Sequence, residues 1–408
     1  MRLTIGVLTA ILIVPALVSP AHAADQGFLF GTITTESGDR YTGRIRWDKN
    51  EGFWDDVLNA TKYDDERYED VRPNRRSRVS IFGLEIVTDG AFQDWNSSSQ
   101  LRFGHIESIV PRSRGRAVVL LKSGEKVRFE DSGTDIGSDN RGIQVFLPDR
   151  EVIDLEWGEI EEVEFFPEPE DYRIPDPTIE RLYGRVVTES GEEYAGFIAW
   201  DADEIYSDDI LDGEEDGRDR KIAMGTIESI TKSGHDACRV RTKSGREMRL
   251  DNSNDVDSGL RGIQIQMPNL GQVEVEWDEF ESITFIPAPT GLQPTYDRFD
   301  GGRPLHGTVI DEDGNSYNGT IVWDNDERYT WEFLDGEADR VQYNVEFAQI
   351  KSIARRSSRA AEVTLRDGTV LDLRDSNDVN DECRGIYIQT DGGLEVLEWD
   401  EFDRVDFD

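Results

Sequence analysis

A set of residues recurs three times along the chain at fixed intervals, and this recurrence constrains the fold more than any other feature of the sequence. The first block comprises Gly31, Gly38, Tyr41, Gly43, Trp47 and Asp48, then Gly184, Gly191, Tyr194, Gly196, Trp200 and Asp201, then Gly307, Gly314, Tyr317, Gly319, Trp323 and Asp324. The second comprises Asp135, Arg141, Gly142, Ile143 and Trp157, then Asp255, Arg261, Gly262, Ile263 and Trp277, then Asp378, Arg384, Gly385, Ile386 and Trp399. The sequence therefore predicts three tandem repeats of about 120 residues each.

The predicted repeats cover residues 27–166, 182–286 and 305–408. Two proline-rich stretches, 167–181 and 287–304, separate them. Such stretches usually form semi-extended spacers between domains. We therefore expect three units that retain some freedom relative to one another.

Repeat 1 carries additional residues near positions 63–95. Its first block is offset by 153 positions from that of repeat 2, whereas the segment 106–109 is offset by only 121 from 227–230, so 153 − 121 = 32 residues are inserted. The inserted region holds Arg72, Arg75, Arg76 and Arg78. An insertion found in one repeat alone is typical of a surface loop or hairpin, and less often of a specific contact site.

The spacing of apolar residues within each repeat indicates β-strands. Tyr41, Gly43, Ile45 and Trp47 lie two positions apart and would share one face of a strand, as would their counterparts in the other repeats. A turn signal that contains a glycine, such as Gly38, precedes each set. The chain is therefore predicted to be all-β and antiparallel.

The two halves of each repeat follow a similar course of strand, glycine turn, strand, polar segment, further strands and a short closing step. The pattern Gly184-x-Val186-x-x-x-x-Gly191-x-x-Tyr194-x-Gly196-x-Ile198 resembles the small five-stranded β-barrels of the Sm-like and Src-homology-3-like type. The resemblance implies one or two small barrels, or a fused sandwich, in each repeat. It does not extend to RNA binding, because the chain lacks the RNA-contact signature of the Sm family and is acidic.

The N-terminal residues are typical of a secretory signal peptide. Arg2 supplies a positive start, an apolar run follows, and Ala21-His22-Ala23 is a small-x-small cleavage site. We expect residues 1–23 to be removed after Ala23, no transmembrane segment to remain, and the protein to be periplasmic or secreted. The chain holds only two cysteines, Cys238 and Cys383, at non-equivalent positions, so a disulfide framework is not expected.

The charge of the chain narrows the choice of partners. The 86 acidic residues outnumber the 45 basic ones and give a formal net charge of −41. Such a surface repels the phosphates of nucleic acids and anionic lipids. Protein or cell-envelope components are the expected partners, and the sequence leaves the oligomeric state open.

The sequence gives no indication of a catalytic site. Beyond the predicted signal the histidines are His105, His235 and His306, and none of them lies at an equivalent position in the repeats. A histidine-based triad or a repeated zinc site is therefore not expected. We predict that the protein is not an enzyme, although carboxylate-based chemistry remains a third alternative.

The second recurring block is the best candidate for a specific site. Its aspartate and arginine positions are Asp135 and Arg141, Asp255 and Arg261, and Asp378 and Arg384. Oxygen-bearing side chains crowd around the aspartates, as a calcium site requires, but an arginine six residues later would repel a cation. The favoured interpretation is an ion pair between each aspartate and its arginine that braces the loop, with no cofactor; bound Ca²⁺ is the alternative.

Nine tryptophans raise the question of exposed aromatic contacts. Six occupy the recurring strand positions and are expected in the core. Trp54, Trp95 and Trp331 do not recur, and they are the candidates for exposed contacts.

Together these features predict a non-catalytic exported β-repeat protein that acts as a binding or scaffolding module in the periplasm or cell envelope. The alternative is a calcium-dependent structural or polysaccharide-binding protein.

Overall fold

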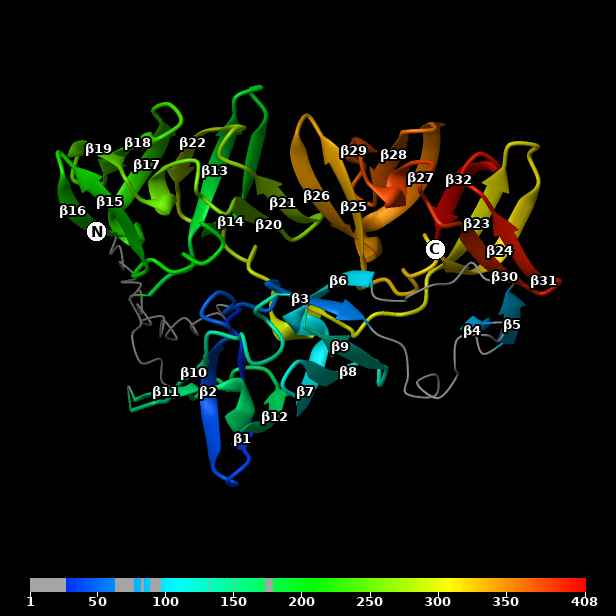
Figure 1. The fold of residues 1–408 in the computed structure, drawn as a ribbon, viewed down its shortest axis with the longest axis horizontal. Coiled ribbons are helices and arrows are strands. Elements are labelled where there is room, and N and C mark those ends of the chain that lie inside the picture. The colour runs from blue at the N-terminus through cyan, green and yellow to red at the C-terminus, as the bar shows by residue number, and fades with distance from the viewer. Residues whose placement is uncertain are drawn as a thin grey trace, which may run out of the picture.

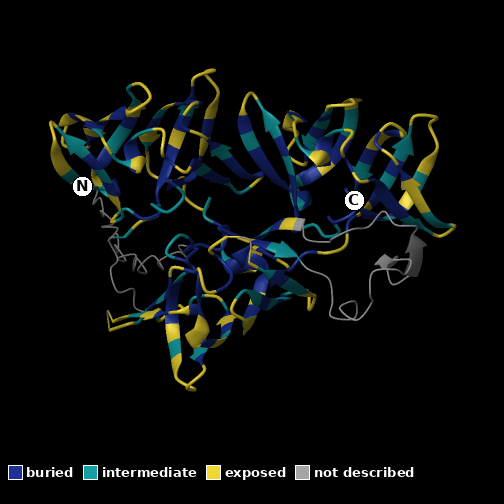
Figure 2. Cartoon of the chain, viewed as in Figure 1, coloured by how far each residue is buried: buried dark blue, intermediate teal, exposed yellow. Residues whose placement is uncertain are grey.

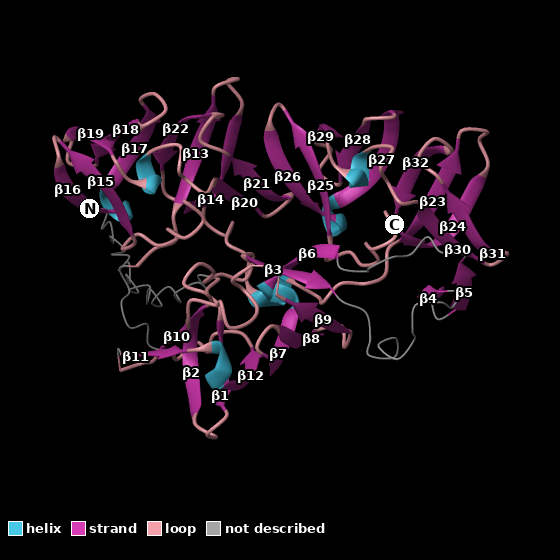
Figure 3. Cartoon of the chain, in the orientation of Figure 1, coloured by secondary structure: helices cyan, strands magenta, loops and turns pink. Residues whose placement is uncertain are grey.

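The computed structural model describes residues 27–62, 97–131, 133–149, 151–172 and 179–408, and in addition the backbone of 77–81 and 84–88. In these residues the regular structure is antiparallel strands with short 3₁₀ turns and no α-helix (Figures 1 and 3). The predicted all-β class is confirmed. The predicted signal peptide, Trp95, and most of the insertion lie outside the described residues. Below, residues 27–166, 182–286 and 305–408 are called the first, second and third segments.

The first segment forms a ten-stranded antiparallel sheet. Its order is β11 (Val152–Leu155), β10 (Ile143–Phe146), β2 (Arg40–Arg46), β1 (Phe30–Thr35), β12 (Ile160–Phe165), β7 (Ile106–Ser113), β8 (Arg116–Leu121), β9 (Lys126–Glu130), β3 (Val57–Lys62) and β6 (Ser97–Arg102).

The second and third segments together form a twenty-stranded sheet. Strand pairings in the second segment follow the order β21 (Gly271–Val275), β20 (Ile263–Met267), β14 (Glu193–Trp200), β13 (Tyr183–Thr188), β22 (Phe280–Phe285), β17 (Ile227–Lys232), β18 (Ala237–Thr242), β19 (Glu247–Asp251), β15 (Ile210–Glu215) and β16 (Arg218–Ala223). In the third segment the order is β31 (Gly393–Leu397), β30 (Ile386–Thr390), β24 (Ser316–Val322), β23 (His306–Asp311), β32 (Phe402–Phe407), β27 (Ile350–Ser357), β28 (Ala360–Leu365), β29 (Val370–Arg374), β25 (Phe333–Ala338) and β26 (Val341–Glu346). Pairing of β21 with β26 joins the two segments.

Recurring glycines lie where neighbouring strands approach too closely for a side chain. Gly43 in β2 pairs with Gly31 in β1, and a Cβ atom on Gly43 would lie 2.2 Å from the carbonyl oxygen of Phe146. A Cβ atom on Gly319 in β24 would likewise lie 2.1 Å from the carbonyl oxygen of Gln389. These contacts explain why glycine interrupts the apolar spacing of this strand.

The recurring tryptophans lie in the core, as predicted. Trp47, Trp200 and Trp323 are fully buried, and Trp157, Trp277 and Trp399 are nearly so. The indole nitrogen of Trp47 donates a hydrogen bond to the backbone carbonyl of Asp135 at 2.8 Å, and Trp200 and Trp323 donate to Asp255 and Asp378 in the same way. Each first-block tryptophan thereby holds the loop that carries the second block.

The insertion lies at the tip of one hairpin. Strands β3 and β6 pair as far as Lys62 and Ser97, which leaves residues 63–96 between them. The corresponding strands β15 and β16 are joined by Asp216 and Gly217 alone. Within the insertion, β4 (Ser77–Ile81) pairs with β5 (Leu84–Thr88).

The stretch 287–304 is packed rather than extended as a free spacer. Tyr296 and Phe299 are buried in the core of the first segment. The Tyr296 hydroxyl donates to the carbonyl oxygen of Ile106 at 2.8 Å, and Phe299 packs edge-on against His105. The expected freedom between units is therefore wrong here, because two aromatic side chains among the prolines supply apolar surface that the first segment buries.

A buried ion pair fixes the first segment against the other two. Arg102 at the end of β6 binds Glu346 at 2.8 Å, with both side chains less than 5% exposed, and it also donates to the carbonyl oxygen of Gly271. His105 reaches the second carboxylate oxygen of Glu346 at 3.2 Å. Burial alone would raise the pKa of Glu346, but Arg102 and His105 outweigh it and the pKa is lowered. Figure 2 shows buried residues along the strands of all three segments.

Candidate functional site

An acidic turn follows the first-block tryptophan in each segment. In the third segment it is Trp323-Asp324-Asn325-Asp326-Glu327, closed by a backbone bridge between Trp323 and Glu327. Asp324 and Asn325 have φ angles of 43° and 71°. Asp and Asn tolerate this left-handed conformation better than most residues. The turns at 47–51 and 200–204 have the same bridge, and the same two positions are left-handed there, although the second is Lys49 or Ala202 instead of an asparagine.

The arginine of the second block binds this turn. Arg384 donates from its backbone nitrogen and its guanidinium to Asp324, and from its guanidinium to Asp326 at 2.6 Å. Arg261 binds Asp201 and Arg141 binds Asp48 in the same manner. The predicted partners Asp378, Asp255 and Asp135 are therefore wrong, because strand pairing brings a residue distant in sequence closer than the aspartate six positions away.

The second-block aspartates hold a strand instead. Asp135, Asp255 and Asp378 each accept a hydrogen bond from a strand backbone nitrogen, those of Asn59, Asp212 and Asp335, at 2.6, 2.7 and 2.8 Å. Burial raises the pKa of Asp135 to about 7 and that of Asp255 to about 6. Burial, together with Asp335 and Asp324, raises the pKa of Asp378 well above its ordinary value.

A further recurring carboxylate escaped the sequence prediction. Asp56, Asp209 and Glu332 lie nine positions after the first-block tryptophans, and each accepts two backbone N–H groups at the end of the acidic turn. Each also binds a basic residue from outside its own segment or near its boundary: Arg181, Arg46 and Lys62, respectively. The sequence does show an acidic residue nine positions after each of these tryptophans. Its basic partners could not be predicted, because they do not lie at equivalent positions.

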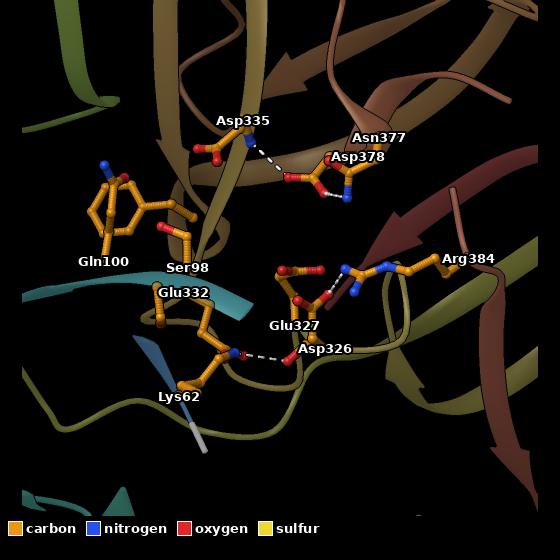
Figure 4. Close-up of a pocket in the computed structure, with 12 residues that line it drawn as sticks. Lys62, Ser98, Gln100, Asp326, Glu327, Glu332, Asp335, Asn377, Asp378 and Arg384 are labelled. Carbon is orange, nitrogen blue, oxygen red and sulfur yellow. Dashed lines mark hydrogen bonds and ion pairs between the residues drawn. The ribbon is translucent and has the colours of Figure 1, made fainter. Parts of the chain in front are cut away.

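The acidic turn of the third segment borders a cavity of about 280 Å³ at the contact with the first segment (Figure 4). β3 and β6 contribute Lys62, Ser98, Ser99 and Gln100 to its wall. Its ionisable lining residues are Lys62, Asp326, Glu327, Glu332, Asp335, Asp378 and Arg384. Five carboxyl groups therefore face two cationic side chains.

The charges in this cavity are unevenly paired. Lys62 donates to the carbonyl oxygen of Asp326 at 2.9 Å and to the Glu332 carboxylate, while Arg384 pairs with Asp326. The Oε2 atom of Glu327 is buried and has no hydrogen-bond partner, and Glu327 is 8% exposed. Burial first, then Asp378 and Asp326, raises the pKa of Glu327 well above its ordinary value. Burial and Asp326 raise the pKa of Asp335 to about 7.

Two of the turns place three carboxylates within reach of one cation. One oxygen each from Asp324, Asp326 and Glu327 lie within 4.8 Å of one another, as do oxygens of the equivalent Asp201, Asp203 and Glu204. Oxygens grouped in this way suit a hard divalent cation such as Ca²⁺. In the first segment Asn50 replaces the middle aspartate.

The tryptophans expected at the surface are buried. Trp54 is 0% exposed and Trp331 is 1% exposed, and both belong to the core of the first segment. The prediction of exposed contacts at these two residues is wrong, because Trp54 packs on Tyr296 of the stretch 287–304 and Trp331 stacks on Tyr329 where the first and third segments meet.

Comparisons with known proteins supply no family. No family model and no curated protein sequence matches the chain. A structural match is the catalytically inactive virginiamycin B lyase from Staphylococcus aureus with quinupristin, at 10% identity and a TM-score of 0.12, covering 74% of this chain and 96% of that one. A similarity at this level shows neither a shared fold nor a shared activity. Within the described residues no helix has the length and apolarity to cross a membrane.

Proposed function

We propose that the chain is a non-catalytic exported scaffold protein of the periplasm or cell envelope, built from three copies of one β module. The common strand order of the three segments supports the repetition. So does the recurrence of the acidic turn, its arginine and the strand-holding aspartate at equivalent positions.

The pairings within a segment support two small barrels per module. One half of the first segment has the order β11-β10-β2-β1-β12 and the other β7-β8-β9-β3-β6, and they meet where β12 pairs with β7. In each half the closing strand follows a short 3₁₀ turn, Phe103–His105 before β7 and Trp157–Glu159 before β12. We infer from these pairings that each half is a five-stranded Src-homology-3-like barrel, with the chain passing between the halves twice.

The scaffold proposal is carried by ion pairs that cross the junctions between parts of the chain. Asp56 binds Arg181 at 2.8 Å, Asp209 binds Arg46 at 2.8 Å, and Glu346 binds Arg102 at 2.8 Å, each across a junction between parts of the chain. Buried, bidentate or networked pairs of this kind fix one relative arrangement of packed units. A rigid three-part body is suited to holding partners at set positions.

The test uses the chain without residues 1–23, immobilised and exposed to a cell-envelope extract, alongside a panel of glycoside, ester and peptide substrates. We expect one envelope component to be retained reproducibly and no substrate to turn over. Turnover of any substrate, lost on substituting a buried carboxylate, would contradict a non-catalytic role.

The acidic turn favours a second candidate function, a calcium-stabilised structural protein. The unpaired buried oxygen of Glu327 beside Asp326 and Asp378 is the specific observation, because a divalent cation would neutralise the one carboxylate of this group whose buried oxygen has no hydrogen-bond partner. Asp326, Glu327 and Asp378 would hold the ion, and Arg384 would release Asp326 while it stays on Asp324.

Thermal melting with Ca²⁺, Mg²⁺ or chelator tests this function. A ligand at 100 times its Kd stabilises the folded state by about 2.7 kcal/mol, so the melting temperature should rise by several degrees in Ca²⁺. D326N and D378N should lose the shift, and D313N, at an exposed hairpin turn, should keep it. Equal melting temperatures with Ca²⁺ and chelator would contradict calcium binding.

A further inference from the structure

The pairing between β21 and β26 joins two different edges. β21 is the last strand at one edge of the second segment, and β26 is the last strand at the opposite edge of the third. They are antiparallel, with Gly271 opposite Val345, Val273 opposite Tyr343 and Glu274 opposite Gln342. Contact between unlike edges is heterologous, and it can therefore be repeated from unit to unit.

The same two kinds of edge remain at the ends of the twenty-stranded sheet. β16 is the counterpart of β26 and pairs with β15, and β31 is the counterpart of β21 and pairs with β30. In the described part of the chain no register joins the other side of either strand to a neighbour. Figure 1 shows β16 and β31 at opposite ends of the sheet, so they cannot meet within one molecule.

Burial separates the joined edges from the open ones. Four of the five residues of β21 and five of the six of β26 are buried. One of the five residues of β31 is buried, and none of the six of β16. Val396 in β31 is 42% exposed. Exposed strand edges carry backbone groups that are ready to pair with another chain.

Superposing the registers predicts which residues would face each other. Within their hairpins Ile263 lies opposite Val275 and Ile386 opposite Leu397, which makes β31 residues 393–397 equivalent to 271–275. Copying the β21–β26 register places Gly393 opposite Ile222, Leu394 opposite Lys221 and Glu395 opposite Arg220.

The charges of the two open edges are complementary. β16 reads Arg218-Asp219-Arg220-Lys221, a basic strand in a chain of net charge −41 whose Arg220 and Lys221 pair with Glu215 and Asp212 of β15, whereas β31 carries Glu395 between Asp391 and Glu398. Opposite charges directly across a strand pair stabilise it, while two β16 edges or two β31 edges would repel each other. Charge thus selects the same unlike pairing that β21 and β26 make.

β16 lacks the carboxylate through which the pairing of β21 with β26, called the internal joint below, depends on the first segment. Glu346 in β26 is buried against Arg102, but its counterpart in β16 is Ala223. The Tyr194–Tyr343 contact of the internal joint, 2.8 Å between hydroxyl oxygens, corresponds to Tyr317 and Arg220. A new joint at β16 therefore buries no carboxylate that needs a third partner, and it places an arginine beside a tyrosine ring.

We propose that β31 of one molecule pairs antiparallel with β16 of the next, so that the protein assembles head to tail with further copies of itself. This names the partner of the proposed scaffold and rests on that function. Since each added copy presents a fresh β31 or β16 edge, the assembly is open-ended.

Sedimentation velocity of the purified chain without residues 1–23 over a concentration series tests the assembly. The wild type should form species larger than a monomer as concentration rises. R220E and E395R should each weaken association about tenfold, and the double variant should restore it. R246E is the matched control, because Arg246 binds the same Glu215 as Arg220 but lies off the edge.

Two further variants separate edge pairing from misfolding. L394P should abolish assembly without loss of the β circular dichroism spectrum, whereas V152P, at the equivalent position of β11, should not affect assembly.

Disulfide trapping tests the register of the pairing. Mixing R220C chains with E395C chains should give a disulfide-linked pair, while neither variant alone should; Cys238 and Cys383 are buried. A monomer at all concentrations, or linkage within either variant alone, would overturn the head-to-tail joint. A monomer that still retains an envelope component would leave the scaffold function standing, so the two failures are distinguishable.

Discussion

At the scale of single residues, the buried second-block aspartates are used for local structure, and burial shifts them toward the neutral form. Asp135 accepts the backbone N–H of Asn59 from a position that is 4% exposed. Burial raises the pKa of Asp135 to about 7. Burial likewise raises the pKa of Asp335 to about 7. The fold therefore favours a proton that the unfolded chain releases near pH 4.

This difference predicts a pH dependence of stability. Because the pKa of Asp135 is higher in the folded than in the unfolded state, its stabilising contribution is complete below about pH 4 and is lost as the pH rises through about 7. D135N, which stays neutral, should flatten the fall in unfolding free energy between these values. Urea unfolding from pH 4 to pH 8 measures it, with the exposed D313N as control. Parallel curves for wild type and D135N would contradict the assignment.

At the scale of elements, glycines decide where strands can approach. Gly271 in β21 has a φ of 147°, and a Cβ atom there would lie 2.0 Å from the carbonyl oxygen of Asn344 in β26. Gly393, its counterpart in β31, has a φ of 132° with no atom within 4 Å of the same point. The two positions share a backbone conformation and differ in the neighbouring strand.

G271A and G393A should therefore differ in stability. Both introduce backbone strain, since alanine rarely adopts such φ values. Only G271A also meets a strand, and it should lower the unfolding free energy by about 1–3 kcal/mol more than G393A. Guanidinium unfolding of the two variants gives this difference directly. Equal losses of unfolding free energy in the two variants would contradict this prediction, because β21 and β26 would then accommodate the added methyl group without an energetic cost.

The strands and the tryptophan core could be predicted from sequence because they depend on a period of two and on local glycine turns. The partner of Arg141 could not, because Asp48 lies 93 positions away and only the pairing of β10 with β2 brings them together. The aromatic residues Tyr296 and Phe299 were a visible signal that the stretch 287–304 is packed, but the prolines around them favoured a spacer.

At the scale of the whole molecule, the segments share their cores and junctions. One buried cluster runs through the second and third segments, and the first segment's cluster includes Trp331 of the third. The Arg102–Glu346 pair lies where all three meet, since Arg102 also donates to Gly271. Such a pair contributes little net stability when intact, but losing one partner leaves a buried charge.

Removing Arg102 should therefore weaken the attachment of the first segment to the other two, because it leaves the Glu346 charge buried. R102A leaves Glu346 buried with His105 alone, and it should lower the unfolding free energy by about 3–5 kcal/mol. R40A, which breaks the exposed Arg40–Glu164 pair, should cost less than about 1 kcal/mol. In calorimetry the wild type should unfold in one main transition, and R102A should separate an earlier transition of the first segment, because the first segment is then the part whose attachment has lost its buried ion pair. Three separate transitions already in the wild type would show instead that the segments are independent units, as the proline-rich stretches alone would suggest.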